Sequence, residues 1–374
     1  MAVCSRLALL GSLGSPRRGW RSLSLFSGPS PSSWSKVVSD AEKIVGYPTS
    51  FMSLRCLLSD ELSNVAMHVR KLVGTKHPLL KTASKHNLQM RGLLVLLMSK
   101  AAGRSDSASD PLLPDMISGI YPSQRILAEI TELIHTAFLV HRGIVNLKEW
   151  TYSDGPLKDM QFGNKMAVLS GDFLLANACT GLAQLNNTKV VELISSAIGD
   201  LVQGVYYENS NCAEEGKLSV AWWEDQVFLS HGALLAKSCQ AAMELARHDA
   251  EAQTLAYEYG KHLALAHKLN SDLQPFMKSG SDPVVFSLDS APVVFHQLIV
   301  GPDRWTHQFQ QAQSLSTQTD YSTLWTRIRS GGGVKQAVDL CTQHGNMALE
   351  AIRCFPPSEA RSALENIAGA VTRF

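Results

Sequence analysis

The chain has 374 residues, of which 45% are hydrophobic and 18% are charged, and its formal net charge is +1. This length and composition can build a substantial buried core, in one large domain or two. The near-neutral charge gives no general basic surface, so nucleic acid is not an expected partner. The seven cysteines include no C-x-x-C pair, which indicates a reducing compartment and no structural zinc. Apolar runs such as 93–98 are much shorter than the ~20 residues of a bilayer span, so no transmembrane segment is expected.

The N-terminal region differs from the rest of the chain in composition. Residues 1–39 contain arginines, many serines and a short leucine-rich stretch, but no acidic residue before Asp40. This combination is typical of a mitochondrial transit peptide, and a disordered basic leader is the alternative. We therefore predict a leader over 1–39, a folded domain over 40–374 and a location in the mitochondrial matrix.

Beyond residue 40, apolar residues recur at three- and four-residue steps, which predicts helices with little sign of strand alternation. The expected helices cover 122–138, 167–182, 188–205, a segment from about 222, 249–273 and 358–371. Thr188 is the expected cap of the third of these helices, and Pro275 is expected to end or kink the fifth. The sequence therefore predicts an all-α protein.

Turn-forming residues predict the connections between these helices. The expected loops lie at 103–114, 153–156, 209–217, 279–283 and 331–333, and the glycine run 331–333 is expected to be a flexible connection. No break in composition divides 40–374, and no repeat of fixed period is present. One large helical domain is the simplest prediction.

Several ordered segments resemble one enzyme family. The stretch 163–176, Gly-Asn-Lys-Met-Ala-Val-Leu-Ser-Gly-Asp-Phe-Leu-Leu-Ala, and the segment 132–141 before it resemble successive helices of the trans-isoprenyl diphosphate synthases, particularly the long-chain polyprenyl enzymes. Further matches lie at 77–79, 91–97 and 232–235, so the resemblance covers most of 50–300. It implies antiparallel helices around a central cavity. In that family two facing D-D-x-x-D motifs hold magnesium against an allylic diphosphate, because carboxylates at i and i+4 share one helical face.

The sequence departs from the family at both metal-binding motifs. The acidic positions of the first motif correspond to Arg142, Gly143 and Asn146, and those of the second to Asn270, Ser271 and Gln274. Asp272 is out of register, and the chain contains no Asp-Asp dipeptide from which either motif could be rebuilt. The alignment therefore predicts no metal site and no catalytic residue on this chain.

The phosphate-binding segments of the family are depleted as well. The pattern G-K-R-x-R-P corresponds to 87–92, where only Arg91 is kept as a possible phosphate contact. The usual Lys-Thr before 232–235 is replaced by Ser230 and His231. Because the cations that neutralise a departing pyrophosphate are lost together with the metal ligands, the chain is not expected to complete the reaction alone.

Five further side chains have both a functional and a structural interpretation. Arg142 could lie near an anionic substrate or pair with an acid of a partner. We expect His141 to satisfy a local hydrogen bond and Asp172 to cap or pack a helix. His262 and His267 lack the i,i+4 spacing of a zinc pair on one helix, so a metal role is not expected.

The resemblance implies a non-catalytic subunit of a heteromeric all-trans polyprenyl diphosphate synthase. The partner would be a catalytic subunit that carries Mg²⁺ and makes the ubiquinone side chain, and this chain could still contact an isoprenoid diphosphate. The alternatives are an isoprenoid-binding scaffold protein and a divergent homodimer that is active by itself. Product length and the choice between dimer and tetramer are left open.

Overall fold

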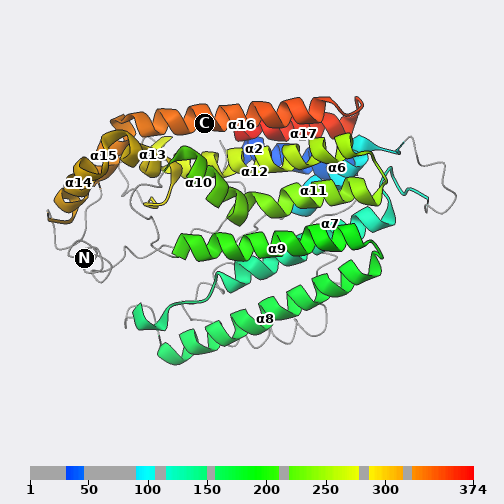
Figure 1. Ribbon diagram of the computed structural model, residues 1–374, viewed down its shortest axis with the longest axis horizontal. Coiled ribbons are helices and arrows are strands. Elements are labelled where there is room, and N and C mark those ends of the chain that lie inside the picture. Colours follow the sequence, from blue (N-terminus) through cyan, green and yellow to red (C-terminus); the bar gives the residue numbers. More distant parts are fainter. Residues whose placement is uncertain are drawn as a thin grey trace. The chain divides into compact units, whose positions relative to one another are not determined.

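The computed structural model describes residues 31–45, 90–105, 115–149, 156–209, 219–277, 286–314 and 322–374. These residues form helices and contain no strand, which confirms the predicted all-α class (Figure 1). Among them, internal contacts define a larger unit within Leu25–Ser271 and Leu340–Phe374, and a smaller unit over Asp272–Asp339. The two units are described separately.

The larger unit contains most of the helices that matter for function. They are α2 (Pro31–Val45), α6 (Arg91–Ala102), α7 (Pro122–His141), η1 (Leu147–Glu149), α8 (Leu157–Gln184), α9 (Thr188–Asn209), α10 (Val220–Val227), the π-helical turn η3 (Phe228–Gly232), α11 (Ala233–Leu245) and α17 (Glu359–Val371). Most of α12 (Ala250–Met277) and the second half of α16 (Gly332–Arg353) also belong to it. The smaller unit contains α13 (Ala291–Val300), α14 (Pro302–Ser314) and α15 (Ser322–Ser330).

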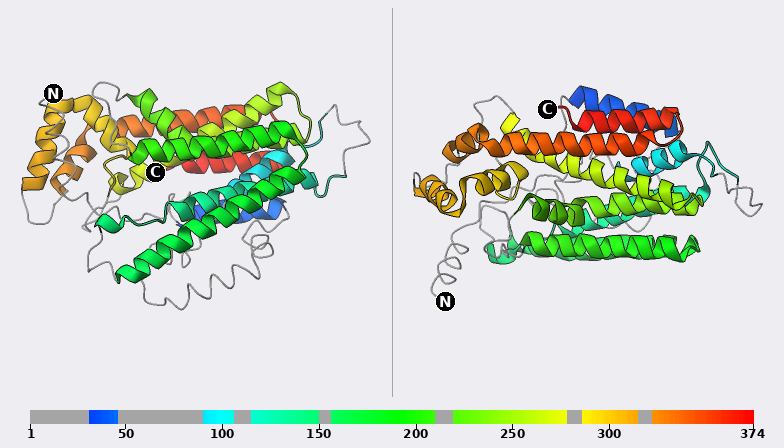
Figure 2. Two further views of the ribbon diagram at one scale, coloured as in Figure 1. Left: turned by 60° about the horizontal axis from the view of Figure 1, so that its bottom comes forward. Right: turned by 45° about the horizontal axis from the view of Figure 1, so that its top comes forward.

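Helix α6 is the centre of the larger unit. Its residues are buried on every side except at Lys100, since α2, α7, α11 and α17 all pack against it (Figure 2). The run 93–98 is therefore a core helix, in which an all-round apolar sequence is expected. The buried side chains Val38, Ala41 and Val45 of α2 join this core, so the boundary of the leader predicted over 1–39 falls inside a packed helix.

Helix α8 lies at the edge of this unit and packs along α7 (Figure 1). Pro122 occupies the first turn of α7, as predicted, because its missing N–H needs no partner there. The buried stripe of α8 is rich in small residues, which let the two backbones approach: Gly163, Ala167, Gly171 and Ala178. Among the described residues, α8 is the one helix long and apolar enough to cross a membrane by length and composition alone. Its small-residue stripe instead packs along α7.

The helix ends test the predicted caps. Thr188 is not the cap of α9, because Asn187 precedes it and its Oδ1 accepts a hydrogen bond of 3.1 Å from the Val190 N–H. An asparagine satisfies this free N–H as well as a threonine does, so sequence alone did not separate the two. Ser358 caps α17 as predicted, through a hydrogen bond of 3.1 Å from the Arg361 N–H. Pro275 does not end α12, which continues to Met277.

The smaller unit corrects the prediction of a flexible glycine linker at 331–333. Helix α16 begins at Gly332, and a Cβ atom on Gly333 would lie 2.5 Å from both the Pro292 carbonyl oxygen and the His296 nitrogen of α13. The glycines therefore allow close helix packing around a core that includes Phe276 and Ile328. The other predicted loops lie mainly or wholly outside the described residues.

Candidate functional site

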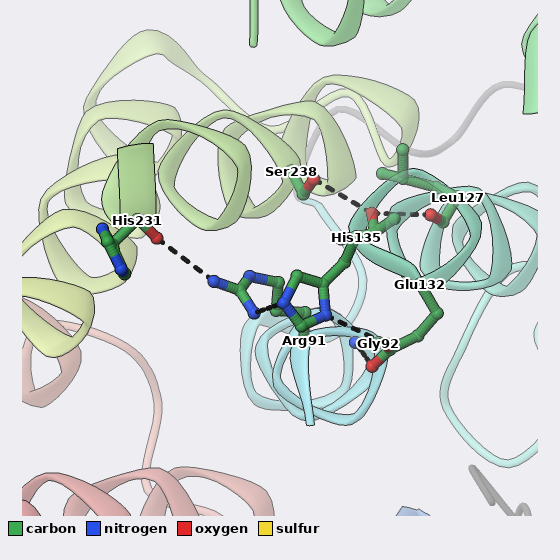
Figure 3. A network of polar contacts seen from close by, with 8 residues as sticks. Arg91, Gly92, Leu127, Glu132, His135, His231 and Ser238 are labelled. Atoms are coloured by element: carbon green, nitrogen blue, oxygen red, sulfur yellow. Dashed lines mark hydrogen bonds and ion pairs between the residues drawn. The ribbon is translucent and has the colours of Figure 1, made fainter. Parts of the chain in front are cut away.

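A buried polar network joins α6, α7 and η3 in the larger unit (Figure 3). Arg91, the first residue of α6, lies with its Nη1 2.5 Å from His135 Nε2, and its Nη2 donates to the His231 carbonyl oxygen at 3.3 Å. The N–H of Gly92 donates to Glu132 Oε1 at 2.8 Å. The exposed fractions of Arg91, Glu132 and His135 are 4%, 5% and 8%, so these charged groups have left water almost completely.

Burial determines the protonation of this network. Burial raises the pKa of Glu132 to about 7, against the opposing effects of the Gly92 N–H and Arg91. Burial also lowers the pKa of Arg91 to about 10, and burial together with Arg91 lowers that of His135 well below its usual range. His135 is therefore neutral, and because a guanidinium can only donate, His135 Nε2 accepts and Nδ1 carries the proton. That Nδ1 faces Glu132 Oε2 at 4.0 Å.

Gly92 explains how two helices come close enough to make the network. A Cβ atom at this position would lie 2.9 Å from the Ala128 carbonyl oxygen and 2.9 Å from Glu132 Cγ. Any larger residue would push α6 away from α7 and break the hydrogen bond to Glu132. The place where the family pattern has proline is therefore a site of close helix contact.

The positions of the first metal motif lie at the end of α7. Arg142 is the C-cap residue, and the Gly143 N–H bonds to the Val140 carbonyl oxygen at 2.9 Å in the turn that follows. Asn146 Oδ1 accepts a hydrogen bond of 3.1 Å from the Lys148 N–H. These three residues thus make local turn and capping contacts.

Arg142 pairs with Glu208 of α9 in the same chain. This acid lies within the chain, a case beside the two considered from the sequence, an anionic substrate and an acid of a partner. The guanidinium also lies over the Phe138 ring, 5.4 Å from its centroid. No signal in the sequence marked this pair, because the two residues are far apart in the chain and meet only when α7 and α9 pack.

His141 of α7 and Asp172 of α8 contact each other across the two helices, and Asp172 is exposed in the middle of α8 rather than at a cap. His141 Nε2 lies 3.3 Å from Asp172 Oδ1 and 3.4 Å from the Val168 carbonyl oxygen, both on α8. The ring rests on Gly171, where a Cβ atom would overlap His141 Nε2. This contact ties the end of α7 to α8.

The first position of the second motif has become a helix-capping site. Asn270 is 3% exposed, and its amide nitrogen donates to the carbonyl oxygens of Val371 at 2.7 Å and Arg373 at 3.2 Å. These carbonyls lie at the C-terminal end of α17, where helix carbonyl groups lack partners within the helix. Here a side chain has to donate hydrogen bonds, which an ionised aspartate cannot do.

The remaining positions of this motif are less buried. Ser271 and Gln274 are half-buried on α12. Asp272, which is out of register for a metal, accepts a hydrogen bond of 3.1 Å through Oδ2 from the Ala291 N–H at the start of α13. Its carboxylate satisfies a free N–H group at a helix N-terminus, where negative charge is favoured.

The residues at the two motifs do not fit a magnesium ion. Magnesium binds through oxygen ligands, commonly carboxylates. The motif positions instead hold an arginine, a glycine, a serine, a glutamine and two asparagines, and the Asn270 amide points its donors at carbonyl oxygens. Across the described residues, no three His, Cys, Asp or Glu side chains are grouped as a metal site.

Comparison with known proteins identifies the family. A model described as polyprenyl synthetase matches residues 76–282. The chain belongs to the polyprenyl synthetase family. It is 63% identical to human all trans-polyprenyl-diphosphate synthase PDSS2 over 98% of this chain and 96% of the relative, which also confirms the likeness of the sequence pattern to decaprenyl diphosphate synthase subunit two.

Two further similarities are more distant. A Neurospora crassa protein named probable hexaprenyl pyrophosphate synthase, mitochondrial, is 32% identical over 90% of this chain and 87% of its own length. The solved apo form of an Arabidopsis medium/long-chain length prenyl pyrophosphate synthase is 29% identical, with a TM-score of 0.59 over 85% of this chain and 98% of that one. Both similarities extend over most of this polyprenyl synthetase chain.

Sequence reasoning found Arg91 but not the groups that surround it. Glu132 and His135 lie three residues apart on a helix whose other buried residues are mostly apolar, and this spacing could have marked them as a buried pair. The contribution of the His231 carbonyl oxygen could not be read from the sequence, since backbone atoms leave no signature.

Proposed function

We propose that this chain is the non-catalytic subunit of a heteromeric all-trans polyprenyl diphosphate synthase that makes the ubiquinone side chain. The observation that carries the proposal is Asn270, whose side chain caps α17 at the position where the family pattern has a metal-binding aspartate. The first motif supports the same proposal, because Arg142 there pairs with Glu208. Mg²⁺ would be held by the catalytic partner.

The phosphate-binding side adds further support. Arg91 is buried, and its guanidinium contacts His135 and the His231 carbonyl oxygen. Its charge thus stabilises internal packing, and a contact with an isoprenoid diphosphate would require these helices to separate. The residues at 230 and 231 supply no permanent cation in place of the family's lysine, because burial and the nearby basic groups lower the pKa of His231 well below its usual range.

The outer faces of α8 and α9 support a protein partner. Large apolar side chains lie exposed there, including Leu169 at 51%, Val202 at 62% and Tyr206 at 70%. Gly199 lies on this exposed face in mid-helix, and a Cβ atom added to it would meet no atom within 4 Å, so the packing of this chain does not require a glycine there. Glycine in a helix costs about 1 kcal/mol relative to alanine. The close approach of a helix from another chain would explain why a glycine stands at position 199.

The size of this face suits a stable complex. At 1.5 Å per residue, α8 and α9 are about 42 and 33 Å long, and a face about 10 Å wide gives about 750 Å². A standard interface buries about 800 Å² on each partner. We therefore propose that the catalytic subunit binds the exposed sides of these two helices, which carry Leu169, Val202 and Tyr206.

The decisive experiment measures incorporation of labelled isopentenyl diphosphate by this chain alone, by the catalytic subunit alone and by the two co-purified. Activity only in the mixture supports the proposal, and turnover by this chain alone contradicts it. Binding without any effect on turnover would point to a scaffold or isoprenoid-binding protein instead. A Leu169→Asp and Val202→Asp double variant should lose co-purification, whereas Ile299→Asp, at a residue 55% exposed on α13, should keep it.

A mitochondrial matrix location is part of the proposal. The acid-free, arginine-containing leader supports it, as does the name of the Neurospora relative. Because Val38 is buried in the core, a cleavage site before α2 is expected rather than one at residue 39. Mass measurement of the N-terminus of the protein from mitochondria tests the position of this cleavage site. An N-terminus within α2 would contradict cleavage before α2.

A further inference from the structure

Two histidines that have no role in the candidate site meet at the junction of α10, α12 and α16. His262 Nδ1 and His344 Nδ1 are 2.9 Å apart, and the rings stack with centroids 5.1 Å apart. The other nitrogen of each ring faces a carboxylate: His344 Nε2 lies 2.9 Å from Glu224 Oε1, and His262 Nε2 lies 3.1 Å from Glu258 Oε2. These four side chains form a continuous chain of polar contacts across three helices.

The contact between the two Nδ1 atoms limits how many protons the pair can hold. A hydrogen bond between them requires a proton on one Nδ1 and a free lone pair on the other. If both imidazoles are protonated, two N–H groups and two positive charges face each other at 2.9 Å. The observed arrangement therefore holds at most one imidazolium, and a second proton must separate the rings.

Burial and Lys261 act in the same direction as this limit, whereas Glu258 acts against it. Lys261 of α12 adds a positive charge, Glu258 of the same helix opposes it, and Asp225 lies beside Glu224 on α10. Burial lowers the pKa of both His262 and His344 to about 4. The charge of Lys261 also lowers both pKa values, and His344 further lowers that of His262. Folded-state pKa values below the usual value of about 6.5 mean that stability from this contact is present above pH 6.5 and is lost as the pH falls.

The position of the pair links it to the buried polar network. Glu224 lies on α10, which continues without a break through η3 into α11. His231, on η3, supplies the carbonyl oxygen that accepts from Arg91. A loss of the Glu224 to His344 contact would free the short helix that precedes this oxygen.

We propose that Glu224, Glu258, His262 and His344 form a proton latch that holds α10 against α12 and α16 while at most one imidazole is charged, and releases α10 when the second becomes protonated. The latch needs no ligand and does not depend on the subunit role proposed above. Its consequence is that acidification loosens η3 and the Arg91 contact before the rest of the core.

Hydrogen exchange of residues 220–232 between about pH 7 and about pH 5 tests the latch in the full chain, with rates corrected for intrinsic pH dependence. The opening constant should rise as the pH falls, by up to about tenfold per pH unit for each proton taken up. His262→Phe keeps a stacked ring but removes one of the two titrating groups of the pair, so its opening should rise less steeply with acid than that of the wild type. His307→Phe, the same change at an exposed histidine of α14, should behave like the wild type.

Two results would overturn the proposal. One is a wild-type opening constant for 220–232 that does not change with pH, which decides the question even if His262→Phe fails to fold. The other is acid opening of the same size in His262→Phe and in the wild type.

Discussion

Replacing Asn270 by aspartate restores the residue that the family pattern has at this position, yet we expect it to destabilise the chain. Asn270 is 3% exposed and donates two hydrogen bonds to the C-terminal carbonyl oxygens of α17. Each lost hydrogen bond costs about 1 kcal/mol, and a buried carboxylate without a partner costs about 3–5 kcal/mol. The negative end of the α17 dipole adds repulsion. The buried carboxylate alone gives an expected loss of at least about 3–5 kcal/mol at neutral pH.

The assay is thermal unfolding of Asn270→Asp followed over pH. Domains of 150–250 residues lose about 2–4 °C in Tm per kcal/mol, so a decrease of about 6 °C or more is expected near pH 7. The new carboxyl should have a raised pKa in the folded chain, because it is buried against carbonyl oxygens. A raised folded pKa means that stability is recovered as the pH falls and is lost as it rises, so the Tm difference from wild type should shrink in acid.

The matched control is Ser271→Asp, which adds the same charge one residue later at a half-buried position on α12. It should cost about 1 kcal/mol or less, as most partly exposed substitutions do. An unchanged Tm for Asn270→Asp at neutral pH, or a Tm that rises on addition of Mg²⁺, would refute the assignment of this position to helix capping.

Three other substitutions test the packing and the buried charge. Gly333→Ala should cost about 1–3 kcal/mol in urea unfolding, because the new methyl group would lie 2.5 Å from backbone atoms of α13; Gly369→Ala, with open space around it on α17, should instead stabilise by up to about 1 kcal/mol. Burial raises the pKa of Glu132 to about 7, so wild-type stability should fall relative to Glu132→Gln as the pH rises from about 5 to 8. A constant difference between these two proteins over that range would show that Glu132 is ionised throughout.

Six helical segments could be predicted from the sequence because their apolar periodicity is strong and local, whereas α2, α6 and α13 to α16 were not among those expected. The starts of α7 and α17 follow from Pro122 and from Ser358, which act within one turn of their own positions. The glycine run at 331–333 was misassigned because glycine is common both in loops and where helices touch. Only the approach of α13 to Gly333 separates the two cases, and that contact comes from tertiary packing.

In the candidate site, too, the contacts made by tertiary packing could not be predicted from the sequence. The loss of carboxylates at Arg142 and Asn270 was visible in the sequence, since it needed only an alignment of residue types. What replaced them was not visible. Glu208 lies 66 positions from Arg142, and the acceptors of Asn270 are backbone oxygens about 100 positions away. Neither pairing has a sequence period that could reveal it.

These contacts bear on whether the two motif positions could take up metal-binding carboxylates. Arg142 neutralises Glu208, and Asn270 satisfies the end of α17, so each former metal position now stabilises the fold. Replacing Arg142 by aspartate would leave the half-buried Glu208 carboxylate without its guanidinium. Replacing Asn270 by aspartate would leave the carbonyl oxygens of Val371 and Arg373 without their donor. Because such losses cost several kcal/mol against a total stability of about 5–15 kcal/mol, a return to metal binding would require coordinated changes at both ends of each contact. Selection on this chain is therefore expected to act on its packing and on the exposed face of α8 and α9 rather than on metal chemistry.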